Sequence, residues 1–98
     1  MPHYIVEITC RVPLSRIKQT VTAHRVHLQT GYDRGLLLAS GPQNPRQGGI
    51  LIARAASQAE LEAFIAQDPC RVDELADYRL IEFLPVMHQS WAGEWFGA

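Results

Sequence analysis

The sequence predicts an α+β protein in which two helices cover one face of a four-stranded antiparallel sheet. Four short β-prone or apolar runs alternate with two segments whose apolar residues recur at helical spacing. Clusters of Pro, Gly and small polar residues separate these segments, and the chain divides into two β-α-β-like halves. The β-α-β-β-α-β order is that of a ferredoxin-like domain, whose right-handed crossovers put both helices on the same face.

The first half begins with a strand and continues into a helix. The residues from His3 to Arg11 are β-prone or apolar, and Pro13 ends this strand. From Ser15, a suitable N-cap, the period becomes helical, and Gly31 or Gly35 ends the helix. One stripe of this helix has i, i+4, i+7, i+11 and i+15 spacing: Ile17, Val21, His24, Leu28 and Tyr32.

Two strands joined by a loop follow this helix. The run from Leu36 to Ser40 predicts a strand that Gly41-Pro42 ends. The polar stretch 43–49 contains prolines and a Gly-Gly pair, which is typical of a loop. Residues 50–55 form the third predicted strand, which is antiparallel to the second if the loop is a hairpin.

The second helix and the last strand complete the fold. Ser57 and Glu60 match a capping box at the start of the helix. Its apolar face consists of Leu61, Phe64 and Ile65. Asp68-Pro69 stops the helix because proline cannot continue the hydrogen-bond ladder. The last strand extends from Tyr78 to Leu84, and Pro85 ends it.

Length and charge restrict the class of protein. The 98 residues suit one domain over 1–98, with a core over 3–85 and an aromatic tail over 86–98. Nine Lys and Arg residues against ten Asp and Glu residues give a net charge of −1, so no nucleic-acid partner is expected. Without a long apolar run or a signal pattern, we expect a cytoplasmic protein with no membrane contact. Cys10 and Cys70 are then expected as free thiols, with a disulfide as the alternative.

The predicted strands carry apolar side chains on both faces of the sheet. These runs are Ile5-Val6, Leu36-Leu37-Leu38, Ile50-Leu51-Ile52 and Leu80-Ile81. Because helices can cover only one face, the other predicts a homodimer with the two sheets face to face. In the tail, Trp91 and Trp95 are expected to pack over their own domain or the partner subunit, with ligand stacking as the alternative.

His24 is the first candidate for chemistry. On an apolar stripe, an imidazole must find a hydrogen-bond partner or lose solvation free energy. If Asp68 supplies that partner, the carboxylate fixes the tautomer and leaves the second ring nitrogen to move a proton. The alternative is a core-edge histidine bonded to a carbonyl or water, with Asp68 in an ordinary helix-end turn.

Two further sites have less support from the sequence. His24 and His27 are three residues apart on a helix, but no third ligand with recognisable spacing accompanies them, so no metal is expected. Cys70 has the chemistry of a nucleophile, although a buried inert thiol is the more common role for such a residue.

Four short motifs, in order, resemble the YCII-related (YciI-like) family over residues 3–85. They are His24, Gly35-Leu36-Leu37-Leu38-Ala39-Ser40-Gly41-Pro42, Gln67-Asp68-Pro69 and Ala76-Asp77-Tyr78-Arg79-Leu80-Ile81-Glu82-Phe83. The resemblance implies a ferredoxin-like dimer, a dimeric α+β barrel. It also implies that His24 and Asp68 line a pocket as a catalytic pair. A specialised member of the family dehydrochlorinates a chlorinated hydroxyhydroquinone, and the wider barrel group includes muconolactone isomerases.

The chain departs from the family pattern at two positions. The residue after Asp-Pro is commonly aromatic in the family but is Cys70 here, which is expected to enlarge or repolarise the pocket. The family often has an arginine three residues before the helix histidine, where this chain has Val21. Arg25 and Arg54 are the candidates to replace that arginine.

The first hypothesis is a cofactor-independent enzyme of lyase or isomerase type that acts on a small cyclic or acidic organic molecule. His24 is its general acid or base, and Asp68 orients and charge-stabilises the ring. The residues expected to bind substrate are Ser40, Gly41, Pro42 and Cys70, with the 40–42 turn near the pocket mouth. The alternatives are a non-catalytic domain that holds a small metabolite and a purely structural dimer module.

Overall fold

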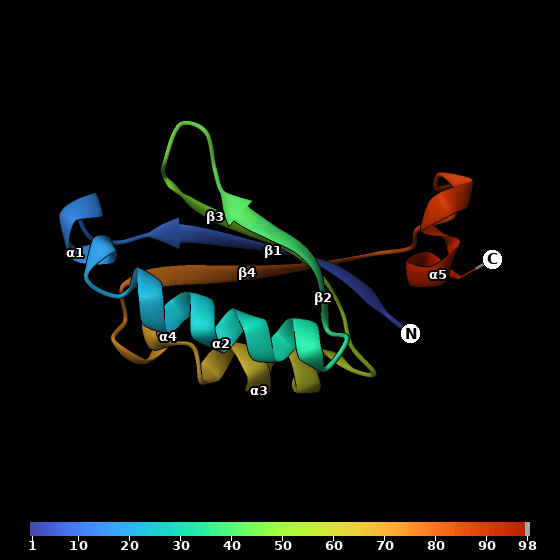
Figure 1. Ribbon diagram of the computed structural model, residues 1–98, viewed down its shortest axis with the longest axis horizontal. Helices are drawn as coiled ribbons and strands as arrows, with labels where there is room; N and C mark the ends of the chain where they lie inside the picture. Colours follow the sequence, from blue (N-terminus) through green and yellow to red (C-terminus); the bar gives the residue numbers. More distant parts are fainter. Residues whose placement is uncertain (98) are drawn as a thin grey trace.

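A four-stranded antiparallel sheet with helices against one face forms the domain, in a computed structural model that describes residues 1–97 (Figure 1). The strands are β1 (His3–Cys10), β2 (Leu37–Pro42), β3 (Gly48–Arg54) and β4 (Ala76–Phe83). The helices are α1 (Leu14–Lys18), α2 (Val21–Asp33), α3 (Gln58–Ala66), α4 (Pro69–Val72), the 3-10 turn η1 (Ser90–Ala92) and α5 (Gly93–Phe96). The strand order β2-β3-β1-β4 confirms the predicted ferredoxin-like α+β fold.

The prediction of a single first helix is wrong, because this segment forms two helices. A break at Gln19 and Thr20 separates α1 from α2. Thr20 is β-branched, which lowers its helix propensity, and its hydroxyl accepts a hydrogen bond from Arg16. Ser15 lies inside α1 rather than at its cap position, which Pro13 occupies. The break turns α1 away from the axis of α2.

Two other element boundaries differ from the prediction. β2 continues through Gly41 and Pro42 instead of ending before them. Proline is tolerated there because β2 is an edge strand, which has neighbours on one side only. The Asp68-Pro69 step ends α3 as predicted, but it also begins the short helix α4, which the sequence pattern did not indicate.

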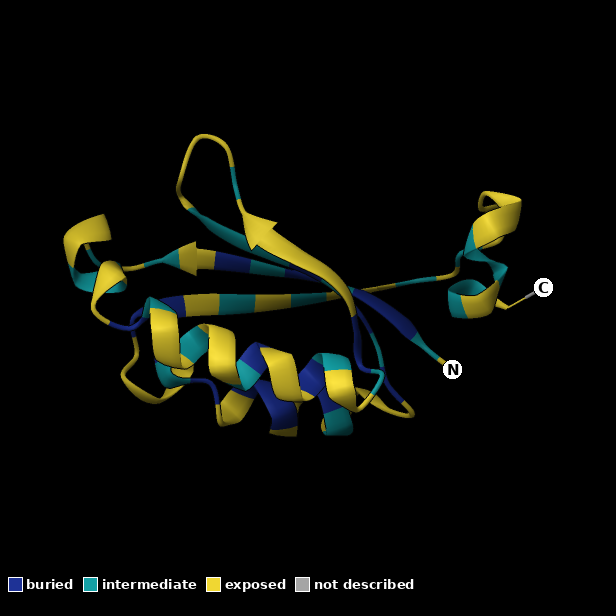
Figure 2. Cartoon of the chain, viewed as in Figure 1, coloured by how far each residue is buried: buried dark blue, intermediate teal, exposed yellow. Residues whose placement is uncertain are grey.

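The core lies between the sheet and the helices. Alternate residues of the two central strands face it, as Figure 2 shows by the alternation of buried and intermediate positions. The buried residues from these strands and α3 are Tyr4, Val6, Ile8, Leu51, Ala53, Leu61, Phe64 and Ile65. Gly31 lets α2 pack closely, because a Cβ at this position would lie 2.6 Å from Cζ of Phe64.

The opposite face of the sheet carries no helix (Figure 1). Ile5 of β1 pairs with Ile52 of β3 and with Ile81 of β4, so these side chains form an apolar row across the sheet. Ile5 and Ile52 are partly exposed, and Ile81 is 36% exposed. We call this row the outer face.

The C-terminal segment packs against its own domain at one end of the sheet. The guanidinium of Arg54 lies 3.9 Å from the ring of Trp95 and donates a hydrogen bond to its carbonyl. The ring of Phe96 contacts His3, with 5.1 Å between the ring centroids. Trp95 thus packs over its own domain, as predicted. Trp91 is 82% exposed on the single chain, and its packing against a partner subunit stays a prediction. None of the helices within residues 1–97 is long and apolar enough to cross a membrane.

Candidate functional site

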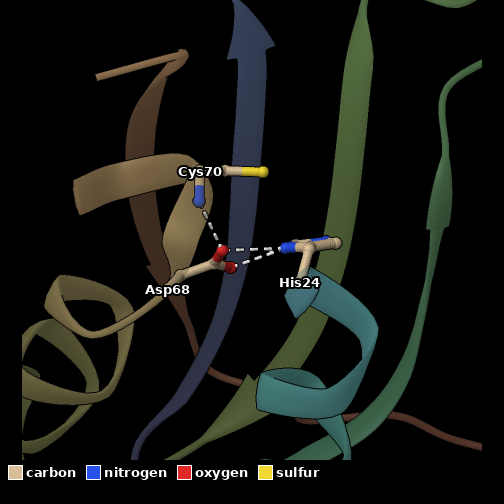
Figure 3. A group of neighbouring side chains, drawn as sticks. All are labelled: His24, Asp68 and Cys70. Carbon is tan, nitrogen blue, oxygen red and sulfur yellow. Dashed lines mark hydrogen bonds and ion pairs between the residues drawn. The ribbon is translucent and has the colours of Figure 1, made fainter. Parts of the chain in front are cut away.

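His24 of α2 and Asp68, from the other half of the chain, meet in an ion pair (Figure 3). Nδ1 of His24 donates to both carboxylate oxygens, at 2.7 Å to Oδ2 and 2.9 Å to Oδ1. Because Nδ1 carries a proton toward the carboxylate, the ring orientation is fixed by this contact. Nε2 has no hydrogen-bond partner among residues 1–97.

The Asp-Pro step positions the carboxylate. An aspartate before proline is pushed toward extended backbone, and Asp68 has φ −67° and ψ 129°. Pro69 then occupies the first position of α4, where a missing N–H is harmless. Asp68 caps this helix by accepting a hydrogen bond from the Cys70 amide at 2.9 Å. Its side chain is 2% exposed, so its position is set by these contacts.

The electrostatics of the pair favour a protonated His24. Burial alone would lower the pKa of His24, because it disfavours the charged ring. The hydrogen bond and negative charge of Asp68, with a smaller contribution from Cys70, outweigh burial and raise the pKa to about 9. At neutral pH the site therefore contains an imidazolium bound to a carboxylate.

Tyr78 is a neighbour of the pair that the sequence reasoning missed. It belongs to the inner face of β4, and its hydroxyl is buried without a hydrogen-bond partner in the described part of the chain. Burial, followed by the negative charges of Asp68 and Cys70, raises the pKa of Tyr78. Its hydroxyl therefore stays protonated beside the carboxylate. The sequence signal that could have identified Tyr78 is the alternation of side chains between the two faces along β4, which places Tyr78 on the face covered by the helices.

A cavity of about 290 Å³ opens beside His24. All four residues predicted to bind substrate line it: Ser40, Gly41, Pro42 and Cys70. Asp68 does not line it, so the expectation that both members of the pair face the pocket is wrong for Asp68, whose carboxylate contacts His24 instead. The Ser40 hydroxyl also shares a 2.7 Å hydrogen bond with that of Tyr32.

The other walls of the cavity are mostly apolar. They come from β1, the loop after it, α1, α2 and β3, and include Ile8, Val12, Leu14, Ile17, Val21, Leu28, Ile50 and Leu51. The break before α2 matters here, because Leu14 and Ile17 of α1 contribute to the wall. Cys10 and Cys70 are not joined to each other, and both line the cavity.

Of the two arginines considered as replacements for the family arginine, only Arg25 lines the cavity. Arg54 instead donates to the Gly35 carbonyl and stacks on Trp95. Arg46, in the loop between β2 and β3, also lines the cavity. Sequence reasoning missed Arg46 because nothing in a loop sequence indicates which way its residues face.

One group of side chains has the composition of a metal site. A His24 ring nitrogen, a carboxylate oxygen of Asp68 and Sγ of Cys70 all lie within 4.8 Å of one another. Nitrogen, oxygen and sulfur ligands together suit Zn²⁺. A metal would, however, have to displace the 2.7 Å bond between His24 and Asp68. His27 is not part of this group, because its Nε2 donates to the Phe64 carbonyl.

Comparison with known proteins agrees with this fold. The family model described as "YCII-related domain" matches residues 1–84. The structure of 5-chloro-2-hydroxyhydroquinone dehydrochlorinase (TftG) from Burkholderia phenoliruptrix AC1100, in complex with 2,5-dihydroxybenzoquinone, is similar, with a TM-score of 0.71. The match covers 93% of this chain and 98% of that chain at 19% identity, which shows a shared fold. No curated protein matches the sequence. Because the family model covers most of the chain, this protein belongs to the YCII-related family.

Proposed function

We propose that this chain is an enzyme of lyase or isomerase type that moves protons on a small cyclic organic molecule. The observation that carries the proposal is the 2.7 Å contact between His24 and Asp68 beside a cavity that His24 lines. Proton transfer requires an acid–base group that is held in one orientation and has a free nitrogen. His24 meets both conditions, because Asp68 holds Nδ1 and Nε2 has no partner among residues 1–97.

In this proposal His24 acts first as a general acid. With a pKa of about 9, it carries a proton on Nε2 at neutral pH and gives this proton to the substrate. The neutral imidazole then takes a proton from a different atom of the substrate, which completes an isomerisation. In an elimination, chloride then leaves and a ring hydroxyl gives its proton to water, so that HCl is lost overall. Asp68 is a positioning residue, because it acts through His24. Ser40 and the Gly41 amide hold a substrate oxygen.

The similar structure supports the choice of substrate class. The name of that protein describes dehydrochlorination of a hydroxylated ring, and its structure contains a bound dihydroxybenzoquinone. The cavity of this chain, at about 290 Å³, is small for a ligand site and suits a single ring. Cys70 and the apolar wall would contact the carbon atoms of that ring.

The test is a panel of ring compounds. The wild-type chain is incubated in D₂O with chlorinated hydroxyhydroquinones, hydroxyquinones and unsaturated lactones. At least one compound is expected to release chloride, isomerise or incorporate deuterium at carbon. Chloride release is measured by chloride assay, isomerisation by absorbance and deuterium incorporation by mass spectrometry. Saturable binding without any product would instead identify a metabolite-binding module, and the enzyme proposal would be wrong.

We also propose that two copies of the chain associate through the outer face. Ile5, Ile52 and Ile81 form an apolar row that nothing within residues 1–97 covers. A contiguous apolar surface on a small domain marks an interface, because its burial removes apolar area from water.

Ile52→Asp is expected to convert this dimer into a monomer, because the interface would then bury an unpaired carboxylate. The dimer dissociation constant should rise by at least about 100-fold, as measured by sedimentation equilibrium. Val26→Asp is the matched control, because Val26 is 65% exposed on α2 and should leave the dimer intact. A wild-type chain that stays monomeric at micromolar concentration would contradict the proposal.

A further inference from the structure

The charged side chains that line the cavity are all basic. They are His24, Arg25 and Arg46, and no Asp or Glu belongs to the lining. Asp68, which does not line the cavity, is paired with His24. Even if the charges of His24 and Asp68 cancel each other, the two guanidinium groups of Arg25 and Arg46 remain at the cavity.

This positive charge is local and does not reflect the whole chain. The net charge of the protein is −1, with ten acidic residues against nine basic ones. A random arrangement of these residues would place carboxylates around a cavity as often as guanidiniums. The positive charge at this lining therefore does not follow from the composition of the whole chain.

Arg25 and Arg46 are also free to bind a ligand. Neither forms a hydrogen bond or an ion pair with another side chain in the part of the chain that the structure describes. Three of the other six arginines are engaged: Arg11 with Asp77, Arg16 with Asp73 and Arg54 with Trp95. Guanidinium groups present several N–H donors in one plane, which match the oxygens of a carboxylate or an enolate.

The remainder of the lining is suited to the apolar part of a ligand. Aliphatic residues of the same cavity, including Val12, Ile17 and Leu28, supply the apolar wall. A ligand that fits must therefore bury carbon atoms against this wall and present a negative group to Arg25 and Arg46. A neutral ring satisfies only the first condition, and an inorganic anion only the second.

We infer that the cavity selects a small organic anion, a single ring that carries a carboxylate or an acidic enolate or phenolate oxygen, through Arg25 and Arg46. The inference deepens the proposed function, because it names the substrate class of the same site. It assigns a binding role to Arg46, which lies outside the motifs of the sequence analysis.

The test compares ring anions with neutral rings of the same shape. Binding of benzoate and phenylacetate to the wild-type chain is measured by calorimetry or NMR against benzamide and phenylacetamide. At low salt each anion is expected to bind about tenfold more tightly than its amide, because two ion pairs form at a partly exposed site. Raising the salt to about 1 M should remove most of this preference, because it screens the charges.

Variants assign the preference to residues. The double variant Arg25→Gln, Arg46→Gln is expected to bind anion and amide equally, within about twofold. Arg34→Gln is the matched control, because Arg34 follows the other end of α2 and does not line the cavity. It should retain the full preference.

Two outcomes would overturn the inference: an anion preference that survives in the double variant, or wild-type binding in which no anion exceeds its amide. Because these measurements need no turnover, they are independent of the acid–base proposal. If the chain prefers anions but converts no compound, the anion-binding inference is confirmed and the proposed enzymatic activity is wrong.

Discussion

His24→Gln is expected to lower turnover of the ring compound identified by the panel by about 1,000-fold, because positioned acid–base groups contribute effects of that size. The glutamine amide can still donate to Asp68, so the fold should remain intact. The wild-type rate should also fall above pH 9, where His24 loses the proton it donates. The measurement is kcat as a function of pH for both proteins, and kcat of the variant should not show this fall above pH 9.

His27→Gln is the matched control for that experiment. His27 is on the same helix and is partly buried, but its ring stacks on Phe64 and does not line the cavity. Its replacement should leave kcat within about twofold, since it touches no reacting group. A His24→Gln variant with more than a tenth of wild-type turnover would remove His24 from the proposed mechanism.

The sequence predicts the parts of this fold in which the spacing of apolar residues repeats over several turns. The helical stripe that contains Val21, His24 and Leu28 is correct, and all three residues line the cavity. The break at Thr20 could not be predicted because a threonine is tolerated inside many helices, and packing decides where the chain turns. α4 was missed for a related reason, since four residues are too few to show a period.

The site was predictable at the level of residue type and not of geometry. His24 was identifiable because a polar ring on an apolar stripe needs a partner, and Asp68 because it precedes proline. Their contact joins positions 44 residues apart, and only the packing of α2 against the start of α4 brings them together. Tyr78 and Arg46 depend on strand register and loop direction, which spacing does not determine.

Asp68→Asn is expected to lower the pKa of His24 from about 9 toward its ordinary value, because burial of the ring is then opposed only by the smaller contribution of Cys70 and no longer by the carboxylate. The consequence for stability has a definite sign. A pKa that is higher in the folded than in the unfolded state stabilises the protein fully below pH 6.5. This contribution is lost as the pH rises to about 9. A shift of this size corresponds to about 3 kcal/mol of unfolding free energy.

The wild-type protein should therefore lose stability between pH 6.5 and 9, whereas Asp68→Asn should not, as measured by NMR titration of the ring and by urea unfolding at several pH values. Asparagine keeps the oxygen that accepts from the Cys70 amide, so the α4 cap survives and the charge alone changes. Asp73→Asn is the control, because Asp73 makes only a half-exposed contact with Arg16 at 3.9 Å. If His24 in Asp68→Asn still titrates near pH 9, the carboxylate is not the cause of its charge, and the positioning role of Asp68 fails.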